Sequence, residues 1–77
     1  MSELNRLRWR CRRGLLELDL TLRRFVESEL DLLSQSDRSA LAELLEYPDN
    51  DLWDVLSGRR VCEDSRLAPL VHRIRAR

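Results

Sequence analysis

Leucine and valine residues recur at intervals of three and four residues along most of this chain. The longest series is the stripe Leu15, Leu18, Leu22, Val26, Leu30 and Leu33. This spacing places every member on one face of an α-helix, and no segment alternates apolar and polar residues for long enough to indicate a strand. Only two glycines and two prolines interrupt the 77 residues. The pattern therefore predicts an all-α fold with short connections.

The same spacing predicts about five short helices. They are expected over residues 2–12, 15–33, 35–46, 50–57 and 66–75. A chain of this length has room for one domain, and such a domain buries only about 60% of the surface that its unfolded chain exposes. We therefore expect residues 1–77 to form a compact single-domain bundle around a thin core.

Residues that favour helix ends stand at several of these boundaries. Ser34 is the expected N-cap of the third helix, and Asp49 is the expected N-cap of the fourth. Gly58 follows the fourth helix, where a glycine commonly ends one. Asp64 or Ser65 can cap the fifth helix. The end signals thus agree with the helices predicted from the apolar spacing.

Charge is balanced overall but unevenly distributed. All 14 basic residues are arginines, and they match 14 acids. Residues 1–13 carry a net charge of +4, residues 27–64 carry −8, and residues 65–77 carry +4. A chain with this pattern has no bulk preference for nucleic acid, so we expect no nucleic-acid partner, and any partner must be matched by a local patch.

The sequence shows no sign of membrane insertion or of a metal site. No apolar run approaches the roughly 20 residues needed to span a bilayer, and no signal core of 7–15 apolar residues stands near the start. Cys11 and Cys62 lack the spacing of zinc ligands, and we expect both to be reduced thiols. A cytoplasmic location in bacteria is the expectation.

Groups that could catalyse a reaction are scarce. The single histidine, His72, has no obvious acid or nucleophile beside it, and Gly14 and Gly58 stand alone and form no phosphate-binding loop. A core this small also leaves little space for a ligand pocket of about 300 Å³. We therefore expect no catalytic residues and no enzymatic activity.

The segment from Arg8 to Asp19 stands out, because it combines four arginines, a tryptophan and a glycine ahead of two acids. We expect Gly14 to turn the chain in the left-handed conformation at a corner between the first two helices. Arg13 would end the first helix and Glu17 would lie in the first turn of the second, so the two could pair or present opposite charges side by side. Trp9 lies off the buried stripe, beside arginines, as in a binding hot spot. In the structural alternative, Gly14 only ends a helix, Glu17 only caps the dipole of the second helix, and Trp9 is a core residue.

Arg13, Gly14 and Glu17 form an RGxxE sequence. It resembles the RGxxE motif of the succinate dehydrogenase assembly factors, the small "flavinator" family of bacteria and mitochondria. Other positions from Arg8 to Arg75 resemble the family pattern as well: Trp9, Cys11 to Gly14, Glu17 to Asp19, Phe25, Glu29, Leu44 to Glu46, Asp49 to Leu52 and Gly58. Val55 departs from it, because the family often has tryptophan there.

The resemblance implies a five-helix bundle that binds the flavoprotein subunit of succinate dehydrogenase or, in some bacteria, that of fumarate reductase. It implies that the chain promotes covalent attachment of FAD to a histidine of that client without carrying the chemistry itself. The FAD belongs to the client, so no cofactor is expected to stay bound to the free, monomeric chain. The implied contact residues are Arg13, Gly14 and Glu17 of the motif and the flanking Arg8, Trp9, Arg12 and Asp19.

Other functions stay open from the sequence. A generic regulatory or antitoxin-like interaction module is the main alternative. A nucleic-acid binder would use the N-terminal arginines, although the acidic middle of the chain would repel phosphate. The sequence also leaves open which client is preferred, whether FAD is contacted directly, and whether the cysteines have a redox role.

Overall fold

The computed structural model describes residues 2–76, so the two terminal residues of the predicted domain, 1 and 77, lie outside the described part. The described residues form five α-helices and one 3-10 turn and contain no strand, which confirms the all-α prediction. The elements are α1 (Glu3–Arg10), α2 (Leu16–Glu29), η1 (Leu30–Leu32), α3 (Gln35–Leu44), α4 (Asp49–Ser57) and α5 (Ala68–Arg75). None of these helices is long and apolar enough to cross a membrane.

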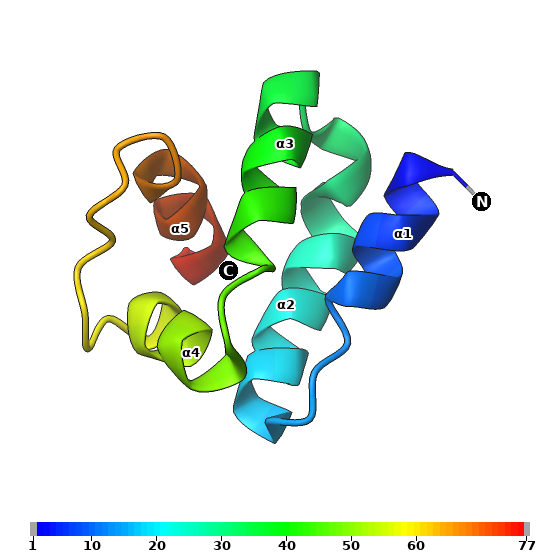
Figure 1. Cartoon of the computed structure of the whole chain (residues 1–77). Helices are drawn as coiled ribbons and strands as arrows, with labels where there is room; N and C mark the ends of the chain where they lie inside the picture. Colours follow the sequence, from blue (N-terminus) through cyan, green and yellow to red (C-terminus); the bar gives the residue numbers. More distant parts are fainter. Residues whose placement is uncertain (1, 77) are drawn as a thin grey trace.

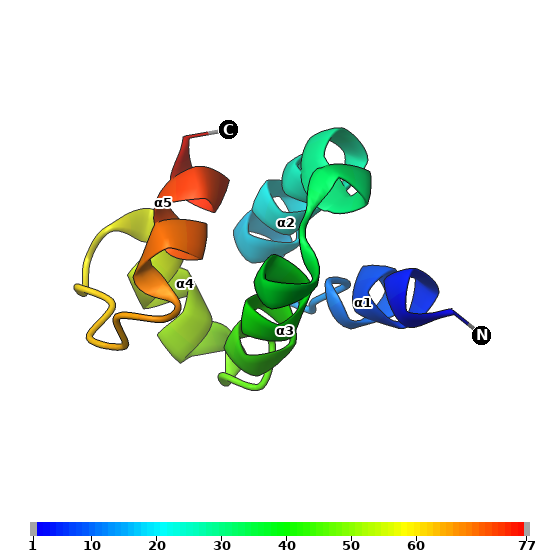
Figure 2. The same cartoon turned by 90° about the horizontal axis from the view of Figure 1, so that it is seen from above.

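Helices α2 and α3 form the centre of the bundle. Figures 1 and 2 show α1 on one side of this pair and α4 with α5 on the other. Helix α1 packs against α3, whereas α2 packs against both α4 and α5, and α5 also contacts α3. The chain thus crosses from one side of the central pair to the other between its first and its last helices.

The buried face of α2 supplies the middle of the core. Leu18, Leu22 and Phe25 are fully buried in a single hydrophobic cluster that all five helices join. Phe25, which lies outside the leucine and valine stripe, is thus part of the core. The predicted helix over 15–33 ends early, because α2 stops at Glu29 and the 3-10 turn η1 follows. Leu33 then leaves in an extended conformation but stays buried.

The helix ends follow the predicted signals in part. The Ser34 hydroxyl accepts the Asp37 amide at 3.1 Å, and Gly58 closes α4 at φ +89°, as the sequence predicts. Asp49 is the first residue of α4 and not its N-cap, which is Pro48. The first helix begins as predicted but ends at Arg10, short of residue 12.

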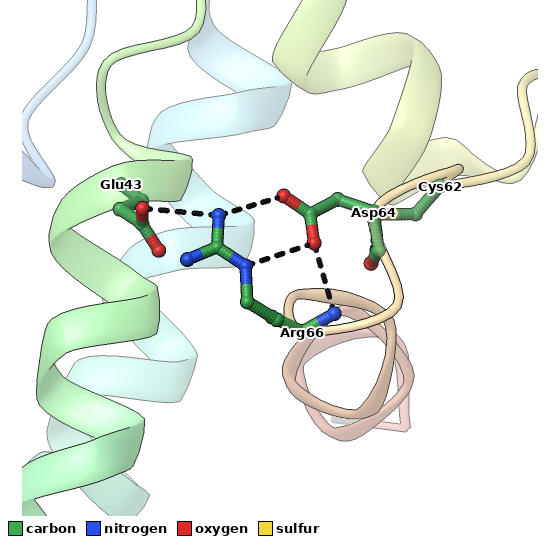
Figure 3. Close-up of polar contacts among 4 residues, drawn as sticks. All are labelled: Glu43, Cys62, Asp64 and Arg66. Atoms are coloured by element: carbon green, nitrogen blue, oxygen red, sulfur yellow. Dashed lines mark hydrogen bonds and ion pairs between the residues drawn. The ribbon is translucent and has the colours of Figure 1, made fainter.

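The connection between α4 and α5 is organised by Asp64. Its carboxylate accepts the Arg66 amide at 2.9 Å, so Asp64 closes a turn before α5, which begins only at Ala68. The Arg66 guanidinium lies between Asp64, at 3.1 Å, and Glu43 of α3, at 3.2 Å (Figure 3). Hydrogen bonds from the Arg66 side chain hold the pKa of Asp64 below its ordinary value.

An ion-pair network around the buried Glu29 fastens α5 to the central pair. The side chain of Glu29 is only 8% exposed, and its carboxylate accepts Arg73 Nε at 2.7 Å. Arg73 Nη1 also reaches Asp37 of α3 at 3.3 Å. The Asp37 side chain is therefore turned toward α5. Arg73 joins α2, α3 and α5 through one guanidinium group.

We expect Arg73→Met to lower the free energy of unfolding by about 1–3 kcal/mol, because it leaves the buried Glu29 carboxylate without its Arg73 partner. Urea denaturation followed by circular dichroism measures the change. Arg59→Met is the control, since Arg59 pairs with Asp54 at 3.6 Å on the surface and should cost less than about 0.5 kcal/mol. Equal losses in the two variants would show that the Arg73 network contributes nothing special.

Candidate functional site

The RGxxE residues lie at the corner between α1 and α2. The corner consists of residues 11–15, and we use this name for them throughout. It starts at Cys11, which is buried, and continues through Arg12 and Gly14, which are exposed. Trp9 stands just before the corner at the end of α1, and Glu17 stands just after it in the first turn of α2.

Arg13 points from the corner into the protein. Its side chain is only 16% exposed, and Nη1 donates to Asp49 Oδ1 at 3.1 Å. Nη2 donates to the carbonyl oxygen of Leu45, which is the C-cap of α3. The predicted pairing of Arg13 with Glu17, or display of both charges on one surface, is therefore wrong. Arg13 turns away from Glu17 because Asp49 and the carbonyl at the end of α3 offer its guanidinium two acceptors at once.

Gly14 does not adopt the left-handed conformation that the sequence predicts. Within residues 2–76 only Gly58 has a positive φ. The chain reverses over the whole five-residue corner, so no single residue needs a conformation reserved for glycine. No atom lies within 4 Å of the place where a Cβ on Gly14 would stand. Gly14 therefore leaves a bare stretch of backbone at the surface.

Asp19 also faces inward. Its side chain is 15% exposed, and Oδ1 accepts the backbone N–H of Arg13 at 3.0 Å. The other oxygen, Oδ2, pairs with Arg23 one turn along α2 at 2.9 Å. Asp19 thus holds the corner against the first turns of α2.

Trp9 and its neighbouring arginines reach solvent. The Trp9 side chain is 61% exposed, so it is not a core residue. The guanidinium carbon of Arg12 lies 5.4 Å from the centroid of the Trp9 ring, within cation–π distance. Arg8, one turn before Arg12 on the same side, lines a shallow hollow together with both. An aromatic ring thus stands on the surface with two positive charges beside it.

A groove of about 290 Å³ separates this edge of α1 from α2. Cys11 and Val26 provide its apolar lining. Its charged lining consists of Arg8, Arg12, Asp19, Arg23 and Glu27. Three guanidinium groups therefore face two carboxylates around an apolar floor.

Two leucines that the sequence analysis did not single out also lie on this side of α2. Leu16 is 68% exposed and Leu20 is 42% exposed. They are one helical turn apart, and helical spacing places Leu20 beside Arg23 and Glu27 at the edge of the groove. The signal was available, because both leucines fall outside the buried stripe. We call Arg8, Trp9, Arg12, Leu16, Glu17 and Leu20 the corner surface.

The described residues bring no metal-binding set together, since no three histidine, cysteine, aspartate or glutamate side chains gather among residues 2–76. Cys11 and Cys62 are free thiols. Burial raises the pKa of Cys11 to about 11, against the lowering effect of Arg13 and Arg10. Cys11 is therefore held as a neutral thiol that packs in the core.

Comparison with known proteins agrees with the resemblance at the motif. Residues 5–77 match the family model described as the flavinator of succinate dehydrogenase. The chain is 40% identical over 75 residues to the FAD assembly factor SdhE of Xylella fastidiosa, covering 97% of this chain and 77% of that protein. It is 39% identical over 77 residues to the FAD assembly factor SdhE of Shewanella oneidensis, and the match covers 100% of this chain and 94% of that protein. It is 46% identical over 69 residues to the FAD assembly factor SdhE of Ralstonia nicotianae, and the match covers 90% of this chain and 73% of that protein. No solved structure matches the chain significantly.

The two glycines should respond differently to replacement by alanine. Gly58→Ala should cost about 1 kcal/mol, because φ is +89° and a Cβ would lie 2.6 Å from the Arg75 guanidinium. Gly14→Ala should change stability by less than about 0.5 kcal/mol, because nothing occupies the space. Thermal melts of the two variants measure this difference. A large loss on Gly14→Ala would mean that the corner is strained.

Cys11 should react far more slowly than an ordinary thiol. With a pKa of about 11 against 9.0, its thiolate fraction at pH 8 is about 100-fold smaller, and burial slows it further. The measurement is alkylation by iodoacetamide, followed by mass spectrometry, in a Cys62→Ser variant that leaves Cys11 alone. The rate should rise with pH up to about 11 and reach that of a free thiol in urea. Rapid labelling of the folded protein at pH 8 would contradict the burial of Cys11.

Proposed function

The chain belongs to the succinate dehydrogenase flavinator family, and we propose from this premise that it binds the flavoprotein subunit of succinate dehydrogenase and promotes the covalent attachment of FAD. The observation that carries the proposal is the match of residues 5–77 to the family model, including the whole corner. The relatives at about 40% identity are FAD assembly factors, and the chain covers most of their length.

The corner surface has the composition of a protein-binding site. Trp9, Leu16 and Leu20 expose large apolar side chains. Tryptophan and arginine commonly dominate the energy of protein interfaces, and exposed leucines add apolar area around them. Arg8 and Arg12 add positive charge beside Trp9, and Glu17 adds a negative charge beside Leu16. A client surface with an apolar patch and charges of both signs would fit this arrangement.

We assign two roles to the residues of the motif and its flanks. Arg8, Trp9, Arg12 and Glu17 are exposed and contact the client, and Gly14 lets the client approach the backbone closely. Arg13 and Asp19 are mostly buried, so they act by holding the corner. This division follows from exposure, because only a side chain that reaches the surface can touch a partner.

The chain acts as a non-enzymatic helper in this proposal, and FAD stays with the client. FAD supplies the ring to which a histidine of the client becomes attached. The hollow of about 610 Å³ is lined by Glu63 and Asp64 against the single cation Arg60, so its lining has a net negative charge that disfavours the diphosphate of FAD. The helper therefore stabilises a client conformation that is competent for attachment, and it contributes no reacting group.

The proposal extends to the partner and the place of action. The flavoprotein subunit of fumarate reductase is a second client, since it undergoes the same type of attachment. The free chain is a monomer in the bacterial cytoplasm, where its two free thiols fit a reducing environment.

Glu17→Gln should lower the flavinylation of the client at least about tenfold when the helper is limiting, because it removes a charge from the interface. The thermal midpoint should stay within about 3 °C, since an exposed side chain contributes little to stability. The measurement is in-gel flavin fluorescence of the client, with circular dichroism of the variant.

Glu43→Gln is the matched control. Glu43 is an exposed acid on α3 whose side chain pairs with Arg66, in the connection before α5, and not with a residue of the corner. It should leave both flavinylation and fold unchanged. If Glu17→Gln lowered flavinylation only as far as it lowered helix content, Glu17 would be a helix cap and not a contact residue.

A further inference from the structure

We propose that Asp49, on α4, is a positioning residue for client binding. The structure links it through Arg13 to the corner, and the corner sets where Trp9, Arg12 and Glu17 stand relative to one another. The inference rests on the proposed function. It adds a residue outside the RGxxE motif, on a different helix, to the groups on which client recognition depends.

The link is a chain of direct contacts. Asp49 Oδ1 accepts Arg13 Nη1 at 3.1 Å across a separation of 36 residues. The same guanidinium donates to the Leu45 carbonyl, so it bridges the end of α3 and the start of α4. The backbone N–H of Arg13 donates to Asp19 Oδ1 at 3.0 Å. One residue therefore joins α3 and α4 to the first turns of α2, which carry Glu17.

Electrostatics favour arginine in this position. The C-terminal end of α3 carries a partial negative charge from its unpaired carbonyl groups, and a cation beside it is stabilised. Asp49 lies in the first turn of α4, where an acid is also favoured. A planar guanidinium can donate to both acceptors simultaneously, which a lysine ammonium does less well. The joint between α3 and α4 is thus built to hold one arginine from the corner.

Bonds within the corner are local and short-range. The Arg12 amide donates back to the Trp9 carbonyl at 3.1 Å, and the Asp19 amide donates to the Leu15 carbonyl at 2.9 Å. Such bonds shape each half of the corner but do not fix it against the rest of the bundle. Cys11 packs in the core at the start of the corner. The Arg13 side chain adds a polar tie from the middle of the corner to the joint of α3 and α4, and Asp49 is its charged partner. Without Asp49, we expect the corner surface to lose its fixed arrangement while the core persists.

The test compares Asp49→Asn with Asp51→Asn. Both acids lie in the first turn of α4, so both variants lose the same favourable interaction with the helix end. Asp51 pairs instead with Arg60 at 3.9 Å on the surface. Purified client subunit is titrated with each variant, and the concentration of helper for half-maximal flavinylation and the rate at saturation are measured. Asp49→Glu is included as the conservative variant.

We expect Asp49→Asn to raise the half-maximal concentration about tenfold with a rate at saturation within about twofold of the unmodified chain. Asp51→Asn should stay within about twofold for both quantities, and Asp49→Glu should recover most of the loss. In a Glu17→Ala background, Asp49→Asn should add less than about twofold, because Asp49 acts through the presentation of the corner. Hydrogen exchange of the Arg13 amide should quicken in Asp49→Asn only.

Three results would overturn the inference. Equal effects of Asp49→Asn and Asp51→Asn would show that only the helix end matters. A loss of equal size in the Glu17→Ala background would show that Asp49 acts on stability and not on the corner. If the unmodified chain neither bound the client nor increased its flavinylation, the proposed function itself would fail. The first two results leave the proposed function standing, so the two failures are distinguishable.

Discussion

The buried face of α2 organises much of the packing in this protein. Leu18, Leu22 and Phe25 lie at the centre of the single cluster formed by the described core residues. Helices α4 and α5 pack on α2, and α1 is held on the opposite side of the central pair. Because one helix supplies the middle of so thin a core, the position of its first turn decides where Glu17 and the exposed leucines stand. The fold and the candidate site therefore share one element.

Arginine side chains supplement this small core at the joints between helices. Arg73 ties α5 to α2 and α3, Arg66 ties the last connection to α3, and Arg13 ties the corner to the joint of α3 and α4. In each case one guanidinium contacts two acceptors from separate segments, which a planar group with five donors does well. Burial of apolar surface alone is limited in a chain of 77 residues. Polar ties of this kind therefore add to the apolar core at the joints between helices, most where the partner is buried, as Glu29 is.

Features that follow from the regular spacing of apolar residues could be predicted from the sequence, whereas contacts between residues far apart in the chain could not. The apolar period located all five helices, and the exposed Glu17 and Trp9 followed from their places off the stripe. The early end of α2 at Glu29 was not predictable, because the 3-10 turn that follows keeps the same leucines buried. The prediction of a left-handed conformation at Gly14 was wrong, because the chain reverses its direction over the five residues of the corner. Nothing local in the sequence couples Arg13 to Asp49, 36 residues away.

The RGxxE spacing makes sense once its two charges are seen to have different tasks. Arg13 lies in the corner, so its long side chain can turn inward to the end of α3, where it donates to the Leu45 carbonyl and to Asp49. Glu17 lies in the first turn of α2, on the face away from the buried stripe, so its carboxylate must remain in solvent. Between them, Gly14 and Leu15 complete the corner and Leu16 begins the helix. A spacing that brought Glu17 onto the buried face would bury an acid, and a spacing that moved Arg13 into α2 would take it away from Asp49. The motif thus combines one residue that fixes the surface with one that the surface displays.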